Sequence, residues 1–323
     1  MNRRKVITLL GGAAAWPVLA GAQQPARPVI GFLHPGSPDT YADRLRAFRQ
    51  GLREAGFVDG ENAAIEFRWA ENRSDRLAEL AGELARRPVA VIVTSGGTVS
   101  ALAAKAATTT VPIVFTVPED PVRLGLVASL AQPGGNATGI NFFSEELAAK
   151  RLELLRELVP AATRIAVLLT PNAGNSLREM ESAAASMGLK VQVSRADTSR
   201  DIDIAFAGLE RGRPDALFVA GGPFLLSRRM QLALLAARHA LPAVYGSREY
   251  AEMGGLMSYG ASLTDAHRQA GLYAGRILKG VKPSDLPVMQ ATKFELVINL
   301  PAARTLGLDM PATLLARADE VIE

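Results

Sequence analysis

Val29-Ile30-Gly31-Phe32-Leu33 is the stretch that decides the fold, and Ile165-Ala166-Val167-Leu168-Leu169 repeats its design. Neither run alternates polar with apolar residues, which is typical of a strand buried on both faces of a parallel sheet. Each run leads into a turn and then into a segment with helical spacing. We therefore predict two lobes of one design, the second beginning near residue 163.

Further short apolar runs leave room for one helix between each pair, and we predict strands at 64–67, 89–93, 112–115, 189–193, 216–219, 241–245 and 294–299. The segments between them carry apolar residues at helical spacing, which predicts helices over 41–55, 76–86, 99–107, 145–158, 175–187, 226–239 and 265–278. Alternation of strand and helix indicates an α/β chain. The predicted fold is two doubly wound, Rossmann-like lobes with parallel sheets.

Two turn-rich stretches predict where the chain passes between the lobes. Residues 132–139 hold three glycines and a proline, and this composition suits a hinge. A second crossing around 257–260 would return the helix at 265–278 to the first lobe. We accordingly place the N-terminal lobe at residues 28–138 plus 260–284, and the C-terminal lobe at 139–259 plus 285–323.

The first 22 residues have the pattern of a secretory signal peptide. Arg3, Arg4 and Lys5 precede an apolar stretch that is too short to span a bilayer, and Ala20-Gly21-Ala22 supplies the small residues that a signal peptidase needs. We expect cleavage after Ala22 and a periplasmic location. The paired arginines fit the twin-arginine export route, while the Sec route remains open.

Charge and cysteine content exclude several classes of protein. The net charge is +4, and three of these charges are the leader's basic residues with no leader acid to offset them, so the mature chain is near +1. Such a chain has little electrostatic attraction for nucleic acid. The chain has no cysteine, which excludes disulfides, thiolate metal sites and a cysteine nucleophile. We expect a monomer without a metal or other cofactor.

Ligands of open parallel sheets bind beyond the carboxyl ends of the strands, so the strand-end loops are the candidate site. In the first lobe these loops supply Pro35, Gly36, Ser37, Ser95, Gly96, Gly97, Thr98, Thr116 and Asp120. Ser95 and Thr98 could cap a helix or, with the two glycines, bind a carboxylate. Asp120 could pair with a substrate ammonium or simply form a turn beside Pro121.

The second lobe supplies the other half of the predicted site, namely Asn172, Asn175, Gly222, Tyr245 and Tyr259. Glycine at such a position permits close approach of a ligand to the backbone. The two tyrosines could each offer a ring face and a hydroxyl, or they could pack in the hinge. The predicted ligand is a small polar or zwitterionic solute with some apolar surface.

Several blocks of the sequence carry a resemblance to a known family, and they lie at 120–139, 150–155, 255–260 and 293–300. The first includes Asp120-Pro121-Val122 and Pro133-Gly134-Gly135-Asn136. Together the blocks resemble the ABC transporter substrate-binding proteins of the tryptophan/tyrosine-type uptake class. The resemblance implies a periplasmic binding protein of type I with a three-crossover hinge, a small-molecule solute and an ABC permease as partners, and an amino acid or an aromatic or carboxylate compound as ligand.

Three other classes compete with this interpretation. An enzyme is disfavoured because the chain has no nucleophile elbow, zinc-protease motif or P-loop, and His34, His239 and His267 show no clustering by spacing. A transcription repressor of two-lobed design would carry a helix-turn-helix where the leader stands. An exported sensor module would bind the same solute but present it to a membrane receptor, and the sequence does not separate it from a transport protein.

Overall fold

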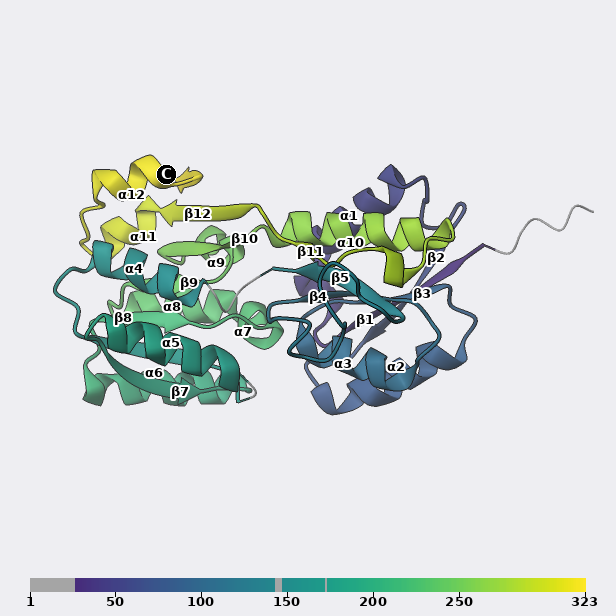
Figure 1. Ribbon diagram of the computed structural model, residues 1–323. Helices are drawn as coiled ribbons and strands as arrows, with labels where there is room; N and C mark the ends of the chain where they lie inside the picture. Colours follow the sequence, from purple (N-terminus) through teal and green to yellow (C-terminus); the bar gives the residue numbers. More distant parts are fainter. Residues whose placement is uncertain (1–26, 143–146, 172) are drawn as a thin grey trace, which may run out of the picture.

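The computed structural model describes residues 27–323 except 143–146 and 172. The predicted signal peptide and Asn172 therefore lie outside the described residues. Figure 1 shows two lobes lying next to each other, each built on one sheet with helices on both faces. No helix among the described residues is long and apolar enough to cross a bilayer.

The N-terminal lobe contains a six-stranded parallel sheet with the order β11-β5-β4-β3-β1-β2. Its strands are β1 (Val29–His34), β2 (Ala64–Trp69), β3 (Val91–Thr94), β4 (Ile113–Val117), β5 (Ala137–Asn141) and β11 (Met289–Gln290). Its helices are α1 (Ala42–Glu54), α2 (Leu77–Arg86), α3 (Thr98–Ala107) and α10 (Leu263–Leu278), with short 3-10 turns at Pro38–Thr40, Ser74–Arg76 and Pro283–Asp285.

Neighbouring residues along a strand bury their side chains on opposite faces of this sheet. Ile30 and Phe32 pack with α1 and α10, whereas Leu33 packs with α2 and α3. Glycine lets α1 and α10 approach closely, because a Cβ on Gly51 would come within 1.9 Å of the Arg268 carbonyl oxygen. The apolar runs of the sequence are thus strands covered on both sides, as predicted.

The C-terminal lobe contains a seven-stranded sheet with the order β13-β12-β10-β9-β8-β6-β7. Its strands are β6 (Arg164–Leu169), β7 (Lys190–Arg195), β8 (Ala216–Val219), β9 (Ala243–Tyr245), β10 (Met257–Ala261), β12 (Phe294–Asn299) and β13 (Glu320–Ile322). Only the β10–β12 pair is antiparallel in the described sheet. Its helices are α4 (Ala148–Leu158), α5 (Gly174–Ser186), α6 (Ser199–Gly212), α7 (Pro223–Ser227), α8 (Arg229–Arg238), α9 (Arg248–Glu252), α11 (Leu300–Thr305) and α12 (Ala312–Arg317).

The two stretches predicted as hinge turns are partly strands, which corrects the sequence-based interpretation. The 132–139 stretch runs into β5, and the 257–260 stretch is most of β10. Their glycines serve close packing, because a Cβ on Gly139 would lie 2.1 Å from the Phe115 carbonyl oxygen and one on Gly260 would lie 2.0 Å from that of Gly246. The predicted helix over 226–239 is also interrupted, since α7 and α8 meet at Arg228.

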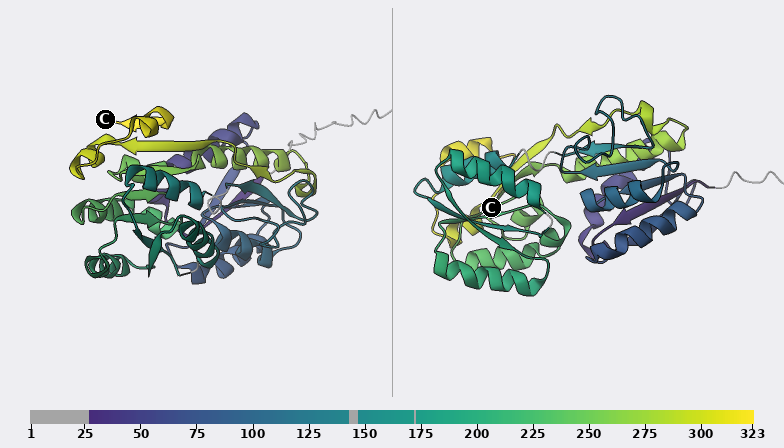
Figure 2. Two further views of the ribbon diagram at one scale, coloured as in Figure 1. Left: turned by 60° about the vertical axis from the view of Figure 1, so that its left-hand side comes forward. Right: turned by 60° about the horizontal axis from the view of Figure 1, so that its bottom comes forward.

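Sheet membership places the three crossings a few residues later than the predicted lobe boundaries. The chain leaves the first sheet after β5 at Asn141, returns after β10 at Ala261, and crosses again between β11 and β12. The second and third crossings lie side by side, since the Ser262 amide donates to the Lys293 carbonyl at 2.9 Å. Both views of Figure 2 show these segments linking the lobes.

Candidate functional site

The loops after β1 and β3 pack directly against each other in the N-terminal lobe. Gly96 has a φ of 83°, and a Cβ there would lie 2.5 Å from Pro35 Cδ and 2.8 Å from His34 Nε2. The first loop is also tied down behind, because the Asn72 amide donates to the Pro35 carbonyl at 2.7 Å. Pro35 and Gly36 are buried and Ser37 is half-buried. The sequence-predicted residues of these two loops thus form one surface.

Ser95 lies at the centre of a buried hydrogen-bond cluster. Its hydroxyl lies 2.6 Å from His267 Nε2 and is also hydrogen-bonded to the Tyr41 hydroxyl, which lies 2.5 Å from the same nitrogen. Thr116 Oγ1 completes the group at 3.5 Å from Ser95 Oγ. The cluster fastens the end of β3 to α1 and α10, although Tyr41 and His267 are 226 residues apart.

Ser95 and His267 have the separation of a nucleophile and its general base, but the environment does not suit that chemistry. Burial, assisted by the positive charge of Arg44, lowers the pKa of His267 to about 3, so the ring is a weak base. Nδ1 lies 2.5 Å from the Leu263 carbonyl and donates to it, which leaves Nε2 to accept from one of the two hydroxyls while the other hydroxyl donates to its neighbour. Ser95 is fully buried. The cluster is therefore best explained as structural.

His34 adds a buried ring at the same place. The Gly36 amide donates to Nδ1 at 2.8 Å, so a neutral ring carries its proton on Nε2. Burial, together with the positive charge of Arg44, lowers the pKa of His34 well below its usual value, which keeps the ring neutral. Nε2 has no hydrogen-bond partner among the described residues. The ring packs 4.0 Å from that of Tyr41, centroid to centroid.

The capping alternative for Ser95 and Thr98 is wrong. Gly97, with a φ of 102°, is the N-cap of α3, and no side chain caps this helix. Thr98 instead donates its hydroxyl to Glu119, a half-buried carboxylate whose pKa is raised by burial. Of the two roles considered for Asp120, the structure shows the turn: its carboxylate accepts a hydrogen bond from the Val122 amide at 2.8 Å. Two acids thus follow β4 in sequence.

The second lobe brings fewer of the predicted residues together. Gly222, with a φ of 149°, is the N-cap of α7, and a Cβ there would lie 3.9 Å from Thr170 at the end of β6. Asn175 lies in the first turn of α5. Tyr259 is half-buried in β10, and its ring stacks against Phe294 with 6.5 Å between centroids.

Tyr245 does not present its ring to the loops between the lobes, which corrects the prediction. The side chain is completely buried in the core under α6 and α8, and it stacks on Tyr250 with 4.5 Å between ring centroids. The physical reason is the alternation of side chains along β9: Val244 packs on the α4 face, so Tyr245 must face the other way.

Arg151 is a buried charged residue near the candidate site that the sequence-based prediction did not include. It projects from α4 toward the carboxyl ends of β8 and β9, where its guanidinium carbon lies 5.5 Å from the Phe218 ring centroid. The absence of a side chain at Gly246 makes room for it, since a Cβ there would lie 3.3 Å from Nη1. Burial lowers the pKa of Arg151 to about 10, so it stays charged at neutral pH. Its sequence block carried the family resemblance, and no spacing rule singled it out.

Within the part of the chain that the structure describes, two ion pairs join the lobes. Arg44 of α1 binds Glu249 of α9 through contacts of 2.5 and 3.0 Å, and the arginine side chain is only 8% exposed. Burial would raise the pKa of Glu249, but the positive charge of Arg44 outweighs it and holds the pKa at about 2. Arg123, in the loop after β4, lies 3.8 Å from Glu179 of α5, and both of these side chains are well exposed.

The described residues contain no group of three or more histidine, aspartate and glutamate side chains that could hold a metal ion. What the arrangement offers is a set of loops, mainly uncharged, with acids on one lobe and a buried arginine on the other. Two doubly wound lobes joined by three crossovers define a periplasmic binding protein of type I.

Comparison with known proteins identifies the family of this chain. Residues 30–322 match the family described as ABC transporter substrate binding protein, and the chain belongs to that family. A relative named tyrosine-binding protein, from Clostridioides difficile (strain R20291), is 28% identical over 266 residues, which are 81% of this chain and 76% of the relative.

Two solved structures of similar identity differ in how well they superpose on this chain. One is a complex with L-Trp of the ABC domain from Streptococcus pneumonia, 25% identical, with a TM-score of 0.83 over 92% of this chain and 100% of that one. The other is the ligand-free, open structure of a substrate binding protein with adhesive properties from Clostridium difficile. It is 27% identical, with a TM-score of 0.65 over 92% of this chain and 99% of that one.

Proposed function

We propose that this protein is the periplasmic solute-binding subunit of an ABC importer and that it closes over an aromatic amino acid between its lobes. The observation that carries the proposal is the contrast between the two solved structures. Coverage and identity are nearly equal, yet the L-Trp complex superposes with a TM-score of 0.83 and the ligand-free, open structure with 0.65. We attribute this contrast to lobe arrangement, in which this chain then resembles the ligand-bound protein more than the open one.

The charges on the two lobes suit a zwitterion. Glu119 and Asp120 follow β4 in the N-terminal lobe, whereas Arg151 lies at the strand ends of the C-terminal lobe. We assign the ligand ammonium to the acids and the carboxylate to Arg151, assisted by the amides at the start of α3. The loops Pro35–Ser37 and Ser95–Thr98, with Thr116, Gly222 and Tyr259, then surround the rest of the ligand.

A thermal-shift screen tests this function. Among L-tryptophan, L-tyrosine, L-phenylalanine, L-leucine and glucose, we expect an aromatic amino acid to raise the melting temperature by roughly 5 °C at 100 times its Kd, which corresponds to about 2.7 kcal/mol of added stability. A set of compounds without effect, or a response to glucose alone, would refute the amino-acid assignment.

Truncated ligands test the assignment of charges. Tryptamine lacks the carboxylate and indole-3-propionate lacks the ammonium, so both should bind more weakly than L-tryptophan by at least tenfold. Replacing Arg151 with methionine should strongly weaken the binding of L-tryptophan and leave the binding of tryptamine unchanged. Equal losses for both ligands would show that Arg151 acts only through the fold.

Uptake measurements separate an importer from a sensor. Cells that lack this protein should lose high-affinity uptake of the ligand found in the screen, and the plasmid-borne gene should restore it. Unchanged uptake, despite tight binding by the purified protein, would instead support the sensor module. A chain lacking residues 1–22 should fail to restore uptake, because we propose that these residues export the protein.

A further inference from the structure

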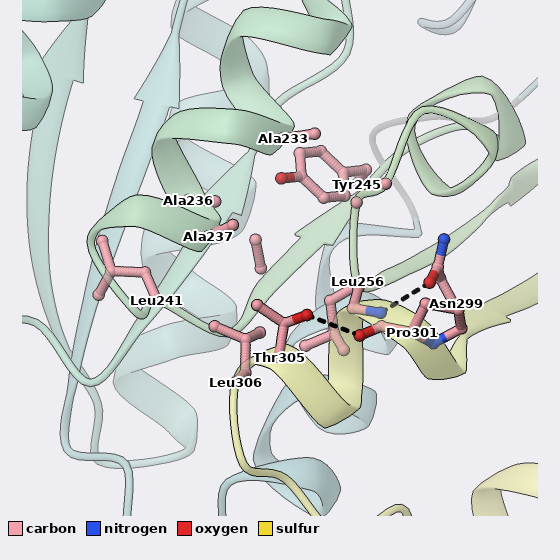
Figure 3. Close-up of a pocket in the computed structure, with 14 residues that line it drawn as sticks. Ala233, Ala236, Ala237, Leu241, Tyr245, Leu256, Asn299, Pro301, Thr305 and Leu306 are labelled. Carbon is pink, nitrogen blue, oxygen red and sulfur yellow. Dashed lines mark hydrogen bonds between the residues drawn. The ribbon is translucent and has the colours of Figure 1, made fainter.

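The C-terminal lobe contains a cavity of about 210 Å³ at the end of its sheet that lies away from the strand-end loops (Figure 3). The chain enters β9 and β10 at this end, and antiparallel β12 leaves here into α11. Lining residues come from α8, these strand ends and α11, and most of them are apolar, among them Ala233, Ala236, Ala237, Leu241, Leu256 and Leu306.

One polar group in this cavity is without a partner. The Tyr245 hydroxyl is fully buried and makes no hydrogen bond with the described residues. Figure 3 shows it pointing from β9 toward the side of the cavity formed by Ala236 and Ala237. The other polar side chains of the lining are satisfied: Asn299 bonds the Ala251 carbonyl and the Ala302 amide, both at 2.8 Å, and Thr305 bonds the Pro301 carbonyl at 2.9 Å.

A buried donor without an acceptor is costly, and native proteins satisfy such groups with protein, water or ligand. An apolar cavity of roughly 150 Å³ is large enough for benzene. We propose that this cavity is a second ligand site, which takes a small uncharged ring compound whose single acceptor oxygen bonds the Tyr245 hydroxyl once that buried hydroxyl turns toward the cavity. Charged amino acids are excluded, because the lining has no charged side chain.

The site has a physical connection to the contact between the lobes. The Tyr245 ring stacks on Tyr250 of α9 at 4.5 Å and an interplanar angle of 13°. The residue before Tyr250 is Glu249, which binds Arg44 of the other lobe. A compound bonded to Tyr245 therefore acts on the short helix that carries this ion pair. On the proposed transport function, on which this step rests, the cavity would tune the affinity for the transported amino acid.

Acetophenone and α-methylstyrene are matched probes, because they have nearly the same shape and only the first has an acceptor oxygen. Binding is measured on the full protein, without amino acid, by ligand-detected NMR. We expect the wild type to bind acetophenone about five- to tenfold more tightly than α-methylstyrene, as one neutral hydrogen bond allows. Tyr245→Phe should abolish this preference while leaving α-methylstyrene binding intact.

Two variants of α8 locate the site. Ala237 is exposed at the cavity rim, so Ala237→Leu should fill the cavity without harming the fold and should prevent binding of both probes. Leu234→Ala, on the exposed face of the same helix, should leave the binding of both probes unchanged. Binding of neither probe to the wild type would overturn the proposal and leave a water-filled cavity. Equal binding of both probes, or binding unaffected by Ala237→Leu, would also overturn it.

The connection between the sites is tested separately. Saturating acetophenone should change the affinity for L-tryptophan about fivefold in the wild type and not in Ala237→Leu, and L-tryptophan should change the acetophenone affinity by the same factor. An unchanged L-tryptophan affinity, with acetophenone bound, would overturn the coupling. If no amino acid binds at all, the proposed transport function fails, whereas the probe measurements without amino acid still decide the second site.

Discussion

The strand-end loops of the two lobes are organised differently. In the N-terminal lobe, Ser95, Tyr41 and His267 bond one another, and Gly96 packs against Pro35. In the C-terminal lobe, a Cβ on Gly222 would lie 3.9 Å from Thr170, which is an ordinary van der Waals distance. The cost of ordering loops on binding falls when they are fixed beforehand. On the proposed function, the N-terminal lobe would provide a preformed surface for the ligand and the C-terminal lobe would complete it.

Removal of His267 from the N-terminal cluster should have the largest effect on stability. His267→Leu leaves the buried hydroxyls of Tyr41 and Ser95 without their shared ring nitrogen, so we expect a loss of about 3 kcal/mol in unfolding free energy, measured by urea denaturation. Thr264→Ala, an exposed change on the same helix, is the control and should cost less than about 0.5 kcal/mol. Similar values for both would show that the cluster contributes little.

Loss of the buried ion pair between the lobes should have the second-largest free-energy effect. Glu249→Gln leaves Arg44 with a neutral partner. Because this arginine is largely buried, we expect the contact between the lobes to weaken by about 2 kcal/mol. The loss should appear chiefly as weaker amino-acid binding, by roughly thirtyfold, since the pair joins the two lobes. Calorimetric titration measures it. Unchanged affinity with reduced stability would mean that the pair holds the fold rather than the closed arrangement.

Acid should reproduce the effect of Glu249→Gln. The pKa of Glu249 is lowered from its usual 4.5 to about 2, so its ionised form is stabilised in the folded protein. The stabilisation is fully present above about pH 4.5 and is lost as the pH falls toward 2. Melting temperatures of the protein with saturating amino acid, measured from pH 6 to pH 2, should therefore fall less steeply in Glu249→Gln than in the wild type. Parallel curves would contradict the assignment.

The exposed interlobe pair should have the smallest effect. Arg123 and Glu179 lie 3.8 Å apart with side chains 63% and 36% exposed, and such pairs contribute little because solvent screens them. We expect Arg123→Gln to change ligand affinity by less than about threefold, in contrast to Glu249→Gln. A larger loss, seen in the same calorimetric titration, would identify Arg123 as a ligand contact.

The sequence was sufficient to predict the strands whose residues are buried on both sides, because their apolar runs are uninterrupted, as in β1 and β6. It was insufficient for β5 and β10, where Gly139 and Gly260 suggested turns but in fact allow neighbouring backbones to touch. Arg44 and Glu249 could not have been paired from spacing, since the residues are 205 positions apart. Tyr245 was misplaced because its position after the apolar run said nothing about which face its ring covers.

Closure of the two lobes over one amino acid is the central claim, and the absence of native cysteine allows it to be measured directly. Spin labels at Arg86→Cys in α2 and Arg211→Cys in α6, both exposed and on different lobes, report the interlobe distance by pulsed electron resonance. We predict that the aromatic amino acid found by thermal shift shortens and narrows the distance distribution, while glucose leaves it unchanged. An identical distribution with and without a bound amino acid would contradict closure.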